Sequence, residues 1–152
     1  LETYLKKGYS REWINQRLQA IQVRKELTDE WDSRGEKQGV EYAILTDEIT
    51  KAWSGMTTRQ YKNLKGLTKE NLRDNMTDLE ILLADIGETA TRELAKKHKP
   101  QGLSQNRKVA KDGGEVANNT RKDLESKLGA PIVTNQNALN YKYTDESKQI
   151  KN

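Results

Sequence analysis

The sequence predicts an all-α fold, an open bundle of about six helices with helix-turn-helix-like segments and a loose C-terminal tail. Apolar residues recur at helical spacing in several segments, and Ser, Thr or Gly residues stand where these segments begin or end. Charged residues make up 33% of the chain and hydrophobic residues only 33%. Because little apolar surface is available for burial, we expect an open body or a surface that a partner completes.

The longest predicted helix covers residues 11–34, with Ser10 as its N-cap and Gly35 at its end. Its apolar stripe is formed by Trp13, Ile14, Leu18, Ile21, Leu27 and Trp31. A helix of this length is typical of bundles and of dimer interfaces. A second helical region is expected at 40–53, before the break at Ser54-Gly55.

Two capping boxes predict the starts of the next helices. Thr57 with Gln60 opens a short helix to residue 65, and Thr77 with Glu80 opens a helix over 78–86. The second of these is the most apolar segment of the chain and the best candidate for the core. One or two helical turns are expected between them, at 68–76.

Glycines and a proline divide the remainder of the chain into shorter predicted helices. We expect Gly87 to loosen or end its helix, Ser104 to cap a helix to residue 111, and Gly113-Gly114 to form a flexible break. Further helices are expected at 91–98 and 115–128. The helical domain is therefore predicted to cover residues 1–130, and residues 131–152 to form an extended, largely flexible tail.

Several function classes lack support in the composition. There is no Cys, His98 is the only His, and no apolar run approaches the roughly 20 residues that cross a bilayer. The adjacent acid pairs point about 100° apart on a helix, so they do not converge on a metal or a substrate. The sequence predicts no catalytic residue, no metal site, no cofactor and no membrane partner.

The most informative segment is the basic run at 94–111, which contains six cations and no acid. They are Lys96, Lys97, Lys99, Arg107, Lys108 and Lys111. They flank the turn at 99–102, which has the length expected between the two helices of a DNA-binding unit. A run of one sign can contact the phosphates of a nucleic acid, or it can be a solvated connector.

Residues 47–65 form a second candidate helix-turn-helix. Gly55 is placed in the turn, and Tyr61 and Leu64 have the spacing of residues that anchor the second helix. Its outward side chains would include Arg59, Lys62 and Lys65, which can reach phosphates and base edges. The alternative is an ordinary helical hairpin with a solvated basic face, since Lys51 stands where the unit usually has Ala.

The three tryptophans fall on apolar faces of the predicted helices and are expected to be core residues. Trp13 and Trp31 are also the candidate anchors for a protein partner, since buried aromatic side chains often dominate protein interfaces.

With these residues in view, the chain resembles the C-terminal region of prophage antirepressor-like proteins that carry an N-terminal BRO domain, some of them labelled DNA-damage-inducible protein D. The resemblance spans most of residues 4–137, and its most specific motif is RKELTDEW at 24–31. The other shared motifs are KGYS at 7–10, EWI at 12–14, AILT at 43–46, ENLRD at 70–74, MTDLE at 76–80, GE at 87–88, QG at 101–102, GG at 113–114 and GxP at 129–131. The chain departs from the pattern at Leu103, where an aromatic is common, and at Asn118, where Gly is common.

The resemblance implies a bacterial or prophage-encoded cytoplasmic protein that is not an enzyme and that acts in transcription regulation or the DNA damage response. Since the chain begins at Leu1 without Met, we expect it to be a piece of a longer protein that lacks the BRO domain. We therefore expect a module that oligomerises with itself and binds a phage repressor or another regulatory protein, with a supporting basic face that contacts DNA. The alternative is a direct helix-turn-helix DNA-binding domain.

Overall fold

The computed structural model describes residues 2–137, and the regular secondary structure of that part is entirely helical. Its elements are α1 (Glu2–Lys6), α2 (Arg11–Ser33), α3 (Val40–Ser54), α4 (Thr58–Leu64), the 3₁₀ helix η1 (Arg73–Asn75), α5 (Asp78–His98) and α6 (Gly102–Leu128). The predicted all-α fold class is confirmed.

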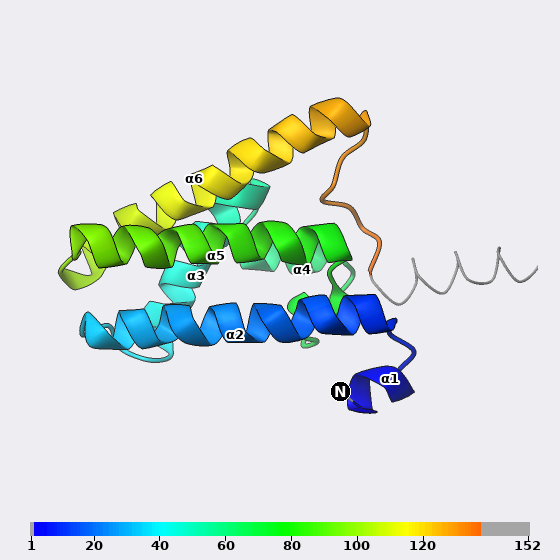
Figure 1. Cartoon of the computed structure of the whole chain (residues 1–152), viewed down its shortest axis with the longest axis horizontal. Coiled ribbons are helices and arrows are strands. Elements are labelled where there is room, and N and C mark those ends of the chain that lie inside the picture. The colour runs from blue at the N-terminus through cyan, green and yellow to red at the C-terminus, as the bar shows by residue number, and fades with distance from the viewer. Residues whose placement is uncertain (1, 138–152) are drawn as a thin grey trace, which may run out of the picture.

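Four long helices form the bundle. The helices α2 and α5 run side by side, and α6 returns along α5 as the second arm of a helical hairpin before the two diverge (Figure 1). The helix α3 lies behind this layer and packs against both α5 and α6. The short helix α1 lies below the start of α2, and the short helix α4 lies behind α5 in this view (Figure 1).

Local side-chain chemistry fixes three helix starts, as the sequence predicts. The Ser10 hydroxyl accepts a hydrogen bond from the Trp13 backbone N–H at 3.1 Å. At α4 and α5 the Thr hydroxyl accepts from the backbone three residues on, and the Gln60 or Glu80 side chain accepts from the backbone N–H of the capping Thr. Both capping boxes are therefore confirmed, and each satisfies two otherwise unpaired N–H groups.

The glycines of the second half do not break helices, which corrects the sequence-based expectation. The helix α5 continues through Gly87, and α6 continues through Gly113 and Gly114. All three are buried, and they allow α3, α5 and α6 to approach closely. The predicted Ser104 cap is also wrong, because α6 already begins at Gly102 and the Gln101 N–H donates to the Gln105 side chain.

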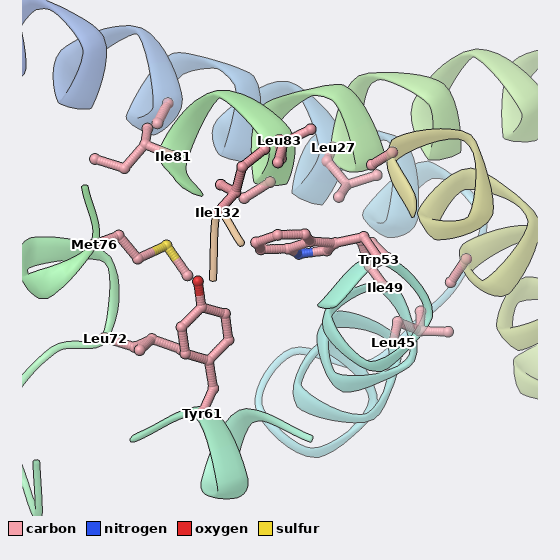
Figure 2. Packing of buried hydrophobic residues seen from close by; sticks show 14 of the residues in the cluster. Leu27, Leu45, Ile49, Trp53, Tyr61, Leu72, Met76, Ile81, Leu83 and Ile132 are labelled. Carbon is pink, nitrogen blue, oxygen red and sulfur yellow. The ribbon is translucent and has the colours of Figure 1, made fainter. Parts of the chain in front are cut away.

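The core lies between α2, α3 and α5 and extends to the segment that follows α6. Figure 2 shows the Trp53 indole reaching from α3 toward Ile132, with the Tyr61 ring and Met76 beside them. The ring centroids of Trp53 and Tyr61 are 5.9 Å apart. Because Ile132 is part of this core, the domain extends beyond its predicted end at residue 130. The rest of the predicted tail, 138–152, lies outside the described residues.

Candidate nucleic-acid interface

The six cations of the basic run lie around one end of the α5–α6 hairpin. Lys96 and Lys97 are in the last turn of α5, and Lys99 follows in a left-handed conformation with φ of 50°. Arg107, Lys108 and Lys111 are in the first three turns of α6. All six residues are exposed, so we call this surface the basic tip. Two separate helices at 91–98 and 104–111 are not formed, because the long α5 and α6 pack lengthwise as a hairpin.

Half of the basic tip is paired with acidic side chains. Arg107 binds Glu48 of α3 at 2.5 Å, Lys108 binds Asp112 at 3.2 Å, and Lys96 lies 3.7 Å from Glu93. The other three cations, Lys97, Lys99 and Lys111, form no ion pair with any residue between 2 and 137. Exposed pairs contribute little and exchange readily, so the tip remains available to a polyanion. Its α5 lysines also complement the helix dipole, which is an independent structural reason for their position.

The second candidate, α3–α4, forms two helices joined by a short turn. Gly55 adopts a left-handed conformation with φ of 81°, and Tyr61 is fully buried as the predicted anchor. Leu64 is a weaker anchor than predicted because it is 38% exposed. Arg59 is exposed and Lys62 is half-buried, so two of the three predicted cations reach the surface.

Lys65 does not reach the surface, which corrects its predicted role. Its side chain and that of Glu80 are both 0% exposed, and its Nζ lies 2.6 Å from Glu80 Oε1. Lys65 also donates to the backbone carbonyl of Gln136, and Tyr61 donates to the same Glu80. A buried carboxylate needs a cation and hydrogen-bond donors, and Lys65 satisfies that need from the end of α4.

The predicted partner anchors are also buried. Trp13 and Trp31 are both 0% exposed. The Trp13 ring stacks on Tyr9 with centroids 4.0 Å apart, and its Nε1 donates to the Met76 carbonyl at 2.9 Å. Both tryptophans are therefore core residues in this structure, and neither presents a surface that a partner can contact.

A buried charge network that the sequence analysis missed connects α2, η1 and α5. Glu88 is 1% exposed and accepts from Arg73, and Arg24 Nη1 lies 3.8 Å from the same carboxylate. Arg17 Nε binds Asp74 Oδ1 at 3.0 Å. One signal points to this network: Arg17 and Arg24 are two helical turns apart on the face of α2 that also carries its apolar stripe.

Asp85 lies one turn before Glu88, and its environment makes stability depend on pH. Burial, and then the Glu88 carboxylate, raise the pKa of Asp85 to about 7, although Arg73, Gln16 and Arg17 oppose the shift. The folded state therefore binds this proton up to about pH 7, whereas the unfolded state releases it near pH 4. The stability that this bound proton contributes is complete below about pH 4 and decreases as the pH rises to about 7. Above about pH 7, Asp85 no longer makes the stability depend on pH.

We expect Asp85→Asn to remove this pH dependence and to raise the melting temperature above that of wild type at about pH 8. Melting temperatures at about pH 5 and pH 8 measure the effect. Asp123→Asn is the control, since the exposed Asp123 pairs only with Lys127 in the described part of the chain. The prediction would be contradicted if the melting temperatures of wild type and Asp85→Asn changed by the same amount between about pH 5 and pH 8.

Over residues 2–137, no three or more His, Cys, Asp or Glu side chains gather where they could hold a metal ion. Nor does any helix of that part have the length and apolar character to span a membrane. A scan against protein-family models found no match, and a search of curated proteins found none either.

Proposed function

We propose that this chain is a non-enzymatic regulatory module of an antirepressor-like protein, which binds partners and contacts nucleic-acid phosphates through the basic tip. The observation that carries the proposal is the concentration of six exposed cations at one end of the α5–α6 hairpin, three of them without an acidic partner in residues 2–137. Each phosphate that such cations neutralise releases counterions, which favours binding at low salt.

The tip is favoured over the α3–α4 unit as the contact surface. The helix α4 has only 7 residues, and its third predicted cation, Lys65, is buried. Gln60 is held in the capping box, so it is not free to read a base edge. Direct base reading by α4 is therefore the weaker alternative, and it would depend mainly on Arg59 and Lys62.

Self-association is the other part of the proposal. A surface groove between α2 and α5 is lined largely by apolar atoms, including those of Val23, Leu82, Ile86 and Ala90. An apolar groove between two long helices supports a role in oligomerisation. Sedimentation velocity without DNA tests this part, and an oligomer that forms independently of DNA would support it.

The test of the basic tip compares two charge-reversal variants with wild type. We expect the binding of wild type to labelled duplex DNA, followed by fluorescence anisotropy, to weaken at least about tenfold between roughly 50 and 200 mM salt. Lys97→Glu/Lys99→Glu/Lys111→Glu is expected to abolish binding. Lys37→Glu/Lys69→Glu/Lys122→Glu has the same change in formal charge at exposed lysines elsewhere, and should bind nearly as wild type.

If the two triple variants lost the same amount of affinity for DNA, net charge, rather than the basic tip, would determine binding. If wild type fails to bind even at low salt, the tip is a solvated surface and the module acts through protein partners alone.

A further inference from the structure

A cavity of about 360 Å³ lies between α2, α3, α4 and the segment 71–76. Within the described part of the chain, its wall combines cationic and apolar side chains and contains no acidic one. The apolar part includes Ile21, which is 44% exposed, whereas Trp53 and Met76, both seen in the core in Figure 2, are each only 1% exposed. Its volume lies within the range of about 300–1,000 Å³ that is typical of small-molecule sites. The cationic part is formed by Arg17, Arg24, Lys62 and Arg73.

Two of these four cations are neutralised by acids behind the wall. Arg73 pairs with the buried Glu88, and Arg17 pairs with Asp74. Lys62 forms no ion pair with any of the described residues. Among the same residues, Arg24 has only a distant acid, at 3.8 Å, and its buried Nη1 has no hydrogen-bond partner.

The charge balance of the site also involves its outer neighbours. An adjoining hollow shares Arg24 and Lys62 with the cavity and adds one acid, Asp47, and one further cation, Arg59. Asp47 is already engaged, since its Oδ1 accepts from the Thr58 backbone N–H at 2.6 Å. Burial lowers the pKa of Arg24, because its guanidinium has lost water that no fixed partner fully replaces. The cavity and its hollow therefore have an excess of positive charge.

Neutral donors complete the site. The Thr58 hydroxyl and the Asn71 side-chain amide both lie on the wall and donate no hydrogen bond within residues 2–137. Asn71 Oδ1 accepts from the Asp74 backbone N–H at 3.0 Å, which fixes its amide and leaves Nδ2 free to donate. The hydroxyls of Thr46 and Thr50 are not available, because each donates to the backbone carbonyl four residues earlier.

We propose that this cavity binds a small phosphorylated molecule, with its phosphate at Arg24 and Lys62 and its apolar part against Ile21. A phosphate carries up to two negative charges and three acceptor oxygens, which match the weakly paired Arg24, Lys62 and two neutral donors. A carboxylate would leave part of this set unsatisfied. This proposal does not depend on the basic tip.

The probes are inorganic phosphate and AMP, followed by ¹H–¹⁵N NMR, with adenosine as the uncharged control. We expect saturable shifts at the amides of Thr58, Lys62, Asn71 and Arg73, with a Kd of about 1 mM or lower for at least one phosphate probe. Adenosine should not reproduce them. Lys62→Gln should weaken binding at least about tenfold. Lys62 forms no ion pair in the described structure, so we expect this variant to fold, and its melting temperature verifies that it does.

Lys69→Gln is the matched control, since Lys69 is exposed and is not part of the cavity wall, and it should bind both probes as wild type. The proposal is overturned if neither probe shifts these amides at about 10 mM, or if Lys62→Gln binds unchanged. If only the amide signals of residues 96–111 shifted, phosphate binding would be assigned to the basic tip. Cavity shifts caused by a short duplex DNA, but by neither probe, would assign the site to nucleic-acid phosphates instead. The basic-tip triple variant should keep its cavity binding, so failure of one proposal is distinguishable from failure of the other.

Discussion

Replacing Gly114 with Ala is expected to destabilise the protein by about 1–3 kcal/mol, the range typical of overpacking. A Cβ at this position would lie 2.5 Å from the Ala52 Cβ and 2.7 Å from the Ile49 carbonyl oxygen. Gly113 is equally constrained, since its Cβ would lie 2.8 Å from the Thr91 Cα. Gly to Ala in a helix interior ordinarily stabilises by about 0.5–1 kcal/mol, so packing reverses the usual sign here.

Urea unfolding followed by circular dichroism measures the effect. Asn119→Ala is the matched control, because Asn119 lies on the exposed face of the same helix and its replacement should be neutral or slightly stabilising. The double variant Gly113→Ala/Gly114→Ala should lose more stability than either single variant, since Gly113 faces α5 and Gly114 faces α3. If Gly114→Ala proved as stable as wild type, the helices could separate at little cost and the close approach would not be required.

Lys65→Met is expected to destabilise the protein by about 3–5 kcal/mol, the cost of leaving a buried carboxylate without its cation. The partner carboxylate, Glu80, is 0% exposed, and among residues 2–137 it would retain only neutral donors: the Tyr61 hydroxyl and the Thr77 backbone N–H. The substitution nearly keeps the length of the side chain, so it leaves no large cavity; it removes the charge and the hydrogen bond that Lys65 donates to the Gln136 carbonyl. Equilibrium urea unfolding of both proteins gives the difference in the free energy of unfolding.

The double variant Lys65→Met/Glu80→Gln tests the electrostatic cause. The amide introduced by Glu80→Gln would still accept in the capping box while carrying no charge, so much of the lost stability should return. Lys69→Met, at an exposed position, should stay within about 0.5 kcal/mol of wild type. A double variant that is less stable than Lys65→Met would mean that the pair acts through its hydrogen bonds and packing, and that the charge of Glu80 is well tolerated.

The features that the sequence predicted correctly are the ones that depend on neighbouring residues. Ser10, Thr57 and Thr77 cap helices because their hydroxyls bond backbone groups within one turn. The end of α2 and the burial of its tryptophans follow from the same local rules of spacing and capping. The exposure of the basic tip could also be predicted, since six cations without an acid seldom enter a core.

The features that it missed depend on which segments meet in space. Gly113 has the composition of a flexible break, but Thr91 packs against it, so its small size permits helix contact. Lys65 follows the outward cations of α4 in sequence, yet the last turn directs it toward a carboxylate 15 residues away. The proposed phosphate cavity combines residues of α2, α3, α4 and the 71–76 segment, which no spacing rule connects.

The segment that follows α6 has a consequence for the order of folding. Ile132 joins the core beside Trp53, and Lys65 bonds a carbonyl 71 residues further along the chain. The α3–α4 and α5–α6 hairpins involve neighbouring stretches, so they can form early, whereas this closure is among the most non-local contacts of the molecule. During synthesis the protein must therefore hold one side of its core exposed to water until nearly all of residues 2–137 have emerged. In that interval a chaperone or a second copy of the chain could compete for the same apolar surface.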